Sequence, residues 1–290
     1  MASTSVIAVV PTYRPEPHGL LDLVTSLGLQ GIPVVISDDA SPCTFDPVLR
    51  SCADAGASVV RHLRNAGIAR GLNDGLGAAL AADASWLLTV DQDSTLPAGY
   101  ASGMLAAALQ AESRLGRGTV GVIGAAILDD ASGEVGYPVI ERDGVATTHE
   151  VFQTGSLWSV RALEEIGGFD ESLGIDGVDA AACLALRAAG LAVALAPSMR
   201  LAHQYGAGTQ VQLLGRTVVS TGHSPARRES MVRNRLRLFP AEFMQSPVHA
   251  FRTLRRVGVN TALGVTVEDG KWANAKGSAR GLLPRRRQPN

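Results

Sequence analysis

Residues 85–94 read SWLLTVDQDS, a short apolar run that ends abruptly in two carboxylates, Asp91 and Asp93. A continuous apolar run of this length is typical of a strand that is buried on both faces of a parallel sheet. Two carboxylates this close repel one another and are costly to bury without a partner. The stretch therefore predicts a buried strand that ends in a pair of acidic side chains.

Similar runs recur along the chain and predict further strands at SVIAVV (5–10), IPVVIS (32–37), ASVVRH (57–62) and TVGVIGAAI (119–127). Residues 16–29 and 68–83 carry leucines at helical spacing. This alternation of strands and helices predicts an α/β fold with a doubly wound, mostly parallel sheet. Ligands bind such sheets at the carboxyl ends of the strands, where Thr12, Asp38, Asp39, Asn65, Asp91 and Asp93 are expected.

The alternation of strands and helices becomes less regular after residue 128, where the sequence predicts a hairpin or irregular β segment. Helices are predicted at 160–171, 175–190 and 225–240, with a strand at 191–197. We expect two parts, a domain over residues 1–240 and a helical C-terminal extension over 241–290. The extension ends in KGSARGLLPRRRQPN, which is typical of a flexible basic tail.

The composition narrows the class of protein. The chain has 290 residues and a formal net charge of −1, which disfavours nucleic acid as a partner. Its three cysteines form no metal-binding spacing and fit a reducing cytoplasm. The start lacks a charged leader, and no run nears the roughly 18 apolar residues of a membrane span. We expect a cytoplasmic protein, and contact with the inner face of the membrane stays open.

The chemistry of Asp91 and Asp93 has two interpretations from the residues alone. Alternate strand residues point the same way, so the pair can bind Mg²⁺ or Mn²⁺, which prefer oxygen ligands. The same stretch also satisfies the DxDx[TV] pattern of haloacid-dehalogenase-like phosphotransferases, in which the first Asp is a nucleophile. That chemistry looks for a basic residue beside the phosphate, and no lysine precedes Lys271.

The order of several motifs along the chain favours the interpretation of Asp91 and Asp93 as a metal site. VVPTYRP (9–15), SDDAS (37–41), NAGIARGLNDGL (65–76), TVDQDS (89–94), residues 154–190 and LAHQYG (201–206) together resemble the family-2 glycosyltransferases with a GT-A fold. The form DQDS, followed by IDGVD, looks most like the bacterial rhamnosyltransferase branch. The resemblance covers about residues 5–240. It implies Asp91, Asp93 and His203 as the metal or diphosphate ligands, and a nucleotide-sugar site formed by Pro11, Thr12, Tyr13, Asp38, Asp39, Asn65, Gly67, Arg70, Asn73, Asp91 and Gln92.

The resemblance also implies a general base on the predicted helix 175–190. Asp176 and Asp179 are three residues apart and would share a helix face. When DAAACLALRAAG (179–190) is aligned with the acidic-helix motif of the family, Asp179 falls at the position of the base. Asp176 would support it or serve as the alternative base. The family often has an acid where this chain has Ala181, and an arginine where it has Ala185. These departures leave open a non-catalytic homologue that only binds nucleotide sugars.

The resemblance gives a less specific indication of the residues that contact the acceptor, which would be Trp158, His223, Arg228 and Arg233. Core packing is the alternative for Trp158, and a solvated face or contact with acidic lipid headgroups is the alternative for the arginines. We expect an inverting enzyme of bacterial polysaccharide biosynthesis. The favoured donor is dTDP-L-rhamnose, with a UDP-sugar such as UDP-galactofuranose as the alternative. The acceptor would be a glycan, a glycolipid or a small molecule.

Overall fold

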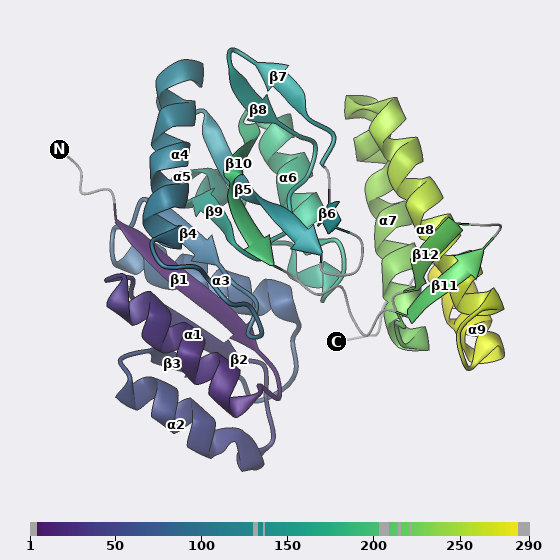
Figure 1. The fold of residues 1–290 in the computed structure, drawn as a ribbon, viewed down its shortest axis with the longest axis horizontal. Coiled ribbons are helices and arrows are strands. Elements are labelled where there is room, and N and C mark those ends of the chain that lie inside the picture. The colour runs from purple at the N-terminus through teal and green to yellow at the C-terminus, as the bar shows by residue number, and fades with distance from the viewer. Residues whose placement is uncertain are drawn as a thin grey trace. The chain divides into compact units, whose positions relative to one another are not determined.

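The computed structural model describes residues 5–129, 133–135, 137–202, 209–213, 216–220 and 222–283. The chain divides into two compact units, coloured by residue number in Figure 1. The first, the sheet unit, comprises Met1–Leu128, Glu134–Gly174 and Val178–His203. The second, the helical unit, comprises Asp129–Gly133, Ile175–Gly177 and Gln204–Asn290. The predicted boundary at residue 240 stays a prediction.

The sheet unit is built on one mixed sheet. Its strands are β1 (Val6–Thr12), β2 (Val34–Asp38), β3 (Ser58–Arg61), β4 (Trp86–Thr89), β5 (Val120–Asp129), β6 (Gly133–Val135), β7 (Ile140–Arg142), β8 (Val145–Thr147), β9 (Ser156–Ser159) and β10 (Ala192–Ala202). They follow the order β3-β2-β1-β4-β9-β5-β10-β8-β7, with β6 paired to β5. Along that order β8 and β9 run against the other seven strands.

The central strands are those with the continuous apolar runs. Val6 to Val10 of β1 and all residues of β2 and β4 are buried, because helices cover both faces of a doubly wound sheet. The parallel register places Thr12 beside Asp38, and Val9 beside Thr89. The carboxyl ends of β1, β2 and β4 therefore meet at one edge of the sheet.

Six α-helices complete the sheet unit among its described residues: α1 (Pro17–Leu29), α2 (Asp46–Asp54), α3 (Ile68–Ala81), α4 (Tyr100–Leu115), α5 (Val160–Glu165) and α6 (Val178–Ala188). Short 3₁₀ turns lie at Cys43–Phe45 and Glu171–Leu173. The caps explain where two of the helices begin, since Glu16 and Ser159 accept hydrogen bonds from the first-turn amides of α1 and α5. Leu72 and Leu76 of α3 are buried against the sheet, as their spacing predicts.

Two glycines let α3 approach its neighbours closely. A Cβ on Gly75 would lie 2.3 Å from the Cβ of Val9, so only glycine lets the helix pack this tightly on β1. Gly67 precedes the helix with a φ of +90°, and a Cβ there would lie 2.7 Å from the carbonyl oxygen of Gly174. The glycines in NAGIARGLNDGL thus set the position of the loop and helix that follow β3.

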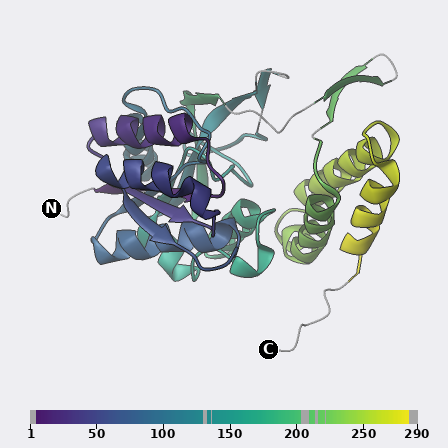
Figure 2. The same ribbon diagram turned by 90° about the horizontal axis from the view of Figure 1, so that it is seen from below.

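The helical unit contains α7 (Pro225–Gln245), α8 (Pro247–Thr266), α9 (Lys271–Gly281) and a separate hairpin of β11 (Thr209–Leu213) and β12 (Arg216–Ser220). Figure 2 shows the three helices packed together. Ser224 and Ser246 cap α7 and α8. The buried guanidinium of Arg228 donates to both carboxylate oxygens of Glu268 at 2.5 Å, and thereby ties α7 to the segment after α8.

The predicted doubly wound α/β sheet with C-terminal helices is confirmed. The sequence did not predict α2, α4 or β9, and β9 enters the sheet antiparallel between β4 and β5. Among the described residues, no helix is both long and apolar enough to cross a lipid bilayer.

Candidate functional site

The carboxyl edge of the sheet brings the predicted donor-site residues of the first half together. Asp38 ends β2, and Tyr13 directly follows β1. Asp91 and Asp93 lie just past β4, whose neighbour is β1. Three loops from separate parts of the sequence thus meet at one edge, as the polar strand ends predict.

Asp38 is fully buried at this edge. Its Oδ2 accepts a hydrogen bond from the Ser41 amide at 3.1 Å and lies 3.3 Å from the Nε of Arg61. Its Oδ1 is buried and has no hydrogen-bond partner among the residues that the structure describes. A buried carboxylate oxygen without a partner is costly, so a ligand N–H or O–H group reaching it would be bound favourably.

Asp39 holds the loop that follows β3. Its two carboxylate oxygens accept hydrogen bonds from the amides of Ala66 and Gly67, at 2.6 and 2.9 Å. The Asn65 side chain donates to the Asp39 carbonyl at 3.4 Å. Both carboxylate oxygens of Asp39 thus accept hydrogen bonds from the protein, whereas Oδ1 of Asp38 accepts none from the described residues.

His62, which sequence reasoning missed, lies between two carboxylates. Its Nδ1 is 3.2 Å from Asp39, and its Nε2 is 2.7 Å from Asp74 of α3, which also accepts from the Ser37 hydroxyl at 2.6 Å. Burial alone would lower the pKa of His62, but the hydrogen bonds to Asp74 and Asp39 outweigh it and raise the pKa above its ordinary value. The imidazolium form fits this position, because it donates from both nitrogens.

Arg70 and Asn73 face the same region from α3. Arg70 is half-exposed, with its Nε 3.4 Å from Asp74 and a terminal nitrogen 3.8 Å from Glu171. The Asn73 amide accepts from the Phe169 amide at 2.8 Å and donates to its carbonyl at 2.9 Å. Asn73 therefore fixes the segment before α6, and Arg70 keeps an exposed guanidinium near the loop.

Tyr13 presents its ring at the edge, and Gln92 holds its backbone. The Gln92 side chain accepts from the Tyr13 amide at 2.8 Å and donates to the Tyr13 carbonyl at 3.2 Å. The ring is 42% exposed, with the Arg14 guanidinium 5.1 Å from its centroid. Thr12 is buried and Pro11 half-buried. The Gln92 amide thus ties the loop after β4 to the loop after β1.

The two acidic residues after β4 have different surroundings. Gln153, also missed, donates to Asp91 Oδ1, and the hydroxyl of its neighbour Thr154 accepts from the Asp91 amide at 3.0 Å. Ser94 shares a hydrogen bond with the Thr154 hydroxyl at 2.9 Å. Asp93 is exposed and makes no hydrogen bond or ion pair within the described part of the chain.

Oriented and exposed carboxylates of this kind suit a hard divalent cation, so the residues present fit Mg²⁺ or Mn²⁺. His203, the third predicted ligand, lies outside the described residues.

The structure contradicts the acceptor-side role predicted for Trp158. Its side chain is fully buried, and its ring packs edge-on against Phe169 with centroids 5.2 Å apart. The indole N–H donates to the Thr89 hydroxyl at 2.9 Å. Trp158 is a core residue, because β9 lies between β4 and β5 in the sheet and all four of its residues are buried.

Asp176 and Asp179 do not share a helix face, because α6 begins only at Val178. Gly177 has a φ of +81°, a left-handed conformation that a helix cannot include, so the prediction of a helix from residue 175 is wrong. Asp179 lies in the first turn of α6 and accepts from the Ala180 amide at 2.8 Å.

Asp176 belongs to the helical unit. Its Oδ1 lies 3.1 Å from the Nε of Arg227, and its carbonyl accepts from the Asn234 side chain at 2.7 Å. Burial raises the pKa of Asp176, and the Arg227 guanidinium only partly offsets this. Asp176 is thus a mostly buried carboxyl group held against α7.

The remaining predicted residues lie on or beside α7 in the helical unit. Arg228 is buried, and besides Glu268 it donates to the His223 carbonyl at 3.1 Å, so the role predicted for its side chain at the acceptor is wrong. Burial, with the charges of two nearby arginines, lowers the pKa of His223 to about 4, so its ring is neutral at pH 7. Arg233 pairs with Glu229 one helical turn away at 2.9 Å.

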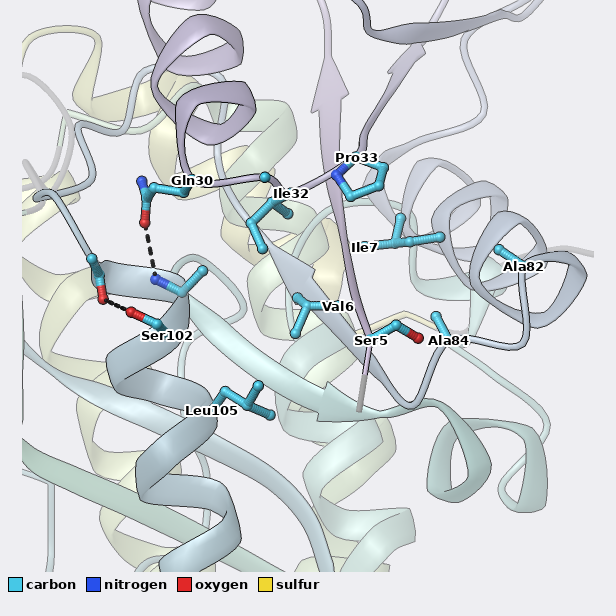
Figure 3. A pocket seen from close by; sticks show the side chains of 13 residues that line it. Ser5, Val6, Ile7, Gln30, Ile32, Pro33, Ala82, Ala84, Ser102 and Leu105 are labelled. Atoms are coloured by element: carbon cyan, nitrogen blue, oxygen red, sulfur yellow. Dashed lines mark hydrogen bonds between the residues drawn. The ribbon is translucent and has the colours of Figure 1, made fainter. Parts of the chain in front are cut away.

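A cavity of about 630 Å³ lies at the opposite edge of the sheet, where β1 begins. Figure 3 shows its apolar lining, with Val6, Ile7, Ile32 and Leu105 around it. Gln30 accepts a hydrogen bond from the Ala101 amide across one side. The described residues that line it carry no charge. This cavity therefore lacks the groups that would bind a diphosphate.

Comparison with known proteins identifies a family to which the first half of the chain is similar. Residues 7–134 match the family described as Glycosyl transferase family 2. The chain is 27% identical over 250 residues to dTDP-rhamnosyl transferase RfbF of Shigella flexneri, covering 80% of this chain and 79% of that protein.

Solved structures of S. aureus TarS are similar in fold. One superimposes with a TM-score of 0.58 at 15% identity over 92% of this chain, which spans about half of that longer chain (47%). TarS 1–349 in complex with UDP gives a TM-score of 0.52 at 16% identity, over 96% of this chain and 70% of that one. Identities this low show the fold alone. Residues 7–134 therefore match the family-2 glycosyltransferases, within a chain that has a GT-A-like fold.

Proposed function

We propose that this chain is an inverting, metal-dependent glycosyltransferase that moves a sugar from a nucleoside-diphosphate donor to an acceptor hydroxyl. The observation that carries the proposal is the gathering of Tyr13, Asp38 and the Asp91–Asp93 pair at one sheet edge, within the segment that matches the family. The same match favours a metal site over a phospho-Asp91 intermediate.

The nucleotide of the donor would bind between the loops after β1 and β2. Tyr13 offers an exposed ring for stacking, and the spare Oδ1 of Asp38 offers an acceptor for a base or ribose hydrogen. Asp39, Asn65 and Gly67 would act by shaping the loop beside it. The TarS complex with UDP supports a nucleoside diphosphate as the ligand class.

The favoured donor is dTDP-L-rhamnose, and the relative named as a dTDP-rhamnosyl transferase supports it. A UDP-sugar, such as UDP-galactofuranose, is the alternative, and TarS in complex with UDP-GlcNAc supports that class. A panel of dTDP- and UDP-sugars, scored by the melting temperature of the full chain, separates the two, because a ligand of the folded state raises the melting temperature.

Asp91 and Asp93 would hold Mg²⁺ or Mn²⁺ against the donor diphosphate, together with His203. The bound ion would offset the negative charge that the diphosphate gains as it leaves. Asp91→Ala and Asp93→Ala should each abolish the metal-dependent part of the thermal shift with donor. A dependence on Mn²⁺ that is unchanged in both variants would contradict this assignment.

Asp179 is the proposed base. It would take the proton from the acceptor hydroxyl as the acceptor oxygen attacks the anomeric carbon. The bond to the diphosphate oxygen breaks on the opposite face, so the configuration inverts. Asp179 belongs to the same compact unit as the donor edge, whereas the alternative, Asp176, is paired with Arg227.

Three variants test the base. Asp179→Asn should stop transfer and leave the thermal shift with donor unchanged, and Asp83→Asn, an exposed residue beyond α3, should change neither. If Asp179→Asn remains active and Asp176→Asn does not, the base is Asp176. If the wild-type chain binds donors but neither hydrolyses nor transfers them to any acceptor, the chain is the non-catalytic homologue that Ala181 and Ala185 left open.

The acceptor would be a glycan, a glycolipid or a small molecule, and the proposed location is the cytoplasm. Contact with the inner face of the membrane would bring the enzyme to a lipid-borne acceptor.

A further inference from the structure

The corner between α7 and α8 carries a cluster of apolar side chains, here called the aromatic corner: Phe239, Phe243, Met244, Val248 and Phe251. The three phenylalanine rings contact one another, with centroids 5.7 to 5.8 Å apart. Met244 and Val248 flank the break at Ser246, where one helix ends and the next begins. The cluster is thus an ordered feature of the helical unit.

Most of the aromatic corner is exposed to solvent. Met244 is 83% exposed, Val248 71%, Phe251 58% and Phe243 39%. Other apolar residues of the same two helices, such as Leu238, Ala250 and Leu263, are buried. Neighbouring exposed apolar side chains of this size mark a surface that a partner covers, since their exposure to water is unfavourable.

The surroundings of the corner are strongly basic. Val248, Arg252 and Arg255 share a face of α8 at positions i, i+4 and i+7, and both arginines are exposed. Residues 231–266 contain six arginines and one acid, a net charge of +5 before any histidine is counted. That acid, Glu242, is buried and paired with Arg235 at 2.6 Å, so it does not neutralise the exposed face.

We propose that the aromatic corner and the basic face of α8 dock on the surface of an anionic lipid bilayer. The apolar side chains would enter the headgroup region while Arg252 and Arg255 contact the lipid phosphates. A second copy of this chain is a poorer occupant, because two faces of the same positive charge repel one another. The proposal rests on the membrane contact in the proposed function and names the surface that would make it, but vesicle binding can be measured without sugar transfer.

Flotation of the full chain with vesicles tests the proposal. Wild-type protein should float with vesicles of phosphatidylcholine mixed with phosphatidylglycerol, and not with phosphatidylcholine alone. Because each basic side chain near an anionic surface strengthens binding about fivefold, Arg252→Ala with Arg255→Ala should weaken binding roughly 25-fold. Val248→Ser with Phe251→Ser should weaken it by at least about tenfold, since two apolar anchors are lost.

Matched controls come from the sheet unit. Leu63→Ser and Arg50→Ala also alter exposed side chains, far along the chain from the corner, and should leave flotation unchanged. Phe251→Trp keeps an apolar ring and should bind as wild type does, which separates loss of the anchor from loss of the fold.

Failure of the wild-type chain to float with anionic vesicles would overturn the proposal, as would unchanged flotation of the Val248→Ser/Phe251→Ser variant. A concentration-dependent dimer of the wild type that this double variant abolishes, without any vesicle binding, would assign the surface to a second copy instead.

Discussion

Replacing His62 with glutamine should destabilise the protein in a pH-dependent manner. The His62 side chain is only 12% exposed and bridges Asp39, which holds the loop after β3, to Asp74 of α3. Glutamine can donate to one carboxylate but carries no charge and cannot bridge both. In His62→Gln, two carboxylates therefore face each other without the cation that separates them.

The magnitude follows from the two hydrogen bonds that are lost. Hydrogen bonds to charged groups contribute about 1.5–3 kcal/mol each. Because both bonds share one ring, and glutamine can replace part of one, we expect a loss of about 3 kcal/mol in the free energy of unfolding at a pH where His62 is charged.

The sign of the pH dependence follows from the direction of the pKa shift. The pKa of His62 is raised in the folded protein above its ordinary value of 6.5. The stabilisation is therefore fully present below about pH 6.5 and is lost as the pH rises through the higher pKa of the folded state. The difference between wild type and His62→Gln should be large near pH 6 and smaller near pH 9.

Urea denaturation of both proteins at these two pH values measures the difference. His62→Lys, which keeps a positive charge over this range, should lose the pH dependence, and hydrogen exchange at Ala66 and Gly67 should speed up in His62→Gln. A destabilisation equal at both pH values, or larger at the alkaline one, would refute an ionised bridge.

Two further changes have defined expectations. Gln92→Ala removes both hydrogen bonds to the Tyr13 backbone and should weaken binding of UDP and dTDP about tenfold, by titration calorimetry, with little change in the melting temperature of the unliganded protein. Gly75→Ala would place a Cβ 2.3 Å from that of Val9 and should cost about 1–3 kcal/mol in urea denaturation, whereas Gly77→Ala on the same helix meets open space and should not destabilise.

The sheet and the polar residues at its carboxyl edge were predictable because both depend on local patterns. Buried parallel strands require continuous apolar runs, and polar residues that end such a run, such as Asp38 and Asp91, fall at or just past the carboxyl end of the strand. The order of the motifs also predicted that these polar residues lie together, and the structure places them at the ends of β1, β2 and β4.

The side chains that orient this edge were not predictable, because their partners are distant in the sequence. Gln153 reaches Asp91 across 62 residues, and Asn73 reaches Phe169 across 96. The sequence around a single Gln or His contains no pattern that predicts such a contact. Trp158 shows the reverse error, since its position beside a family motif suggested a ligand contact, whereas β9 lies between β4 and β5 and all four of its residues are buried.

The two candidate bases illustrate why a periodic pattern alone cannot locate a helix start. The apolar spacing of the 175–190 stretch is compatible with one continuous helix, but Gly174 and Gly177 adopt φ values of +73° and +81°. The helix can begin only after the second glycine, so Asp176 lies in the preceding turn and Asp179 in the first helical turn. Substitutions of the two residues are therefore not equivalent. Asp176→Asn weakens an ion pair with Arg227 inside the helical unit and should alter stability, whereas a loss of transfer in Asp179→Asn at unchanged stability would report on chemistry.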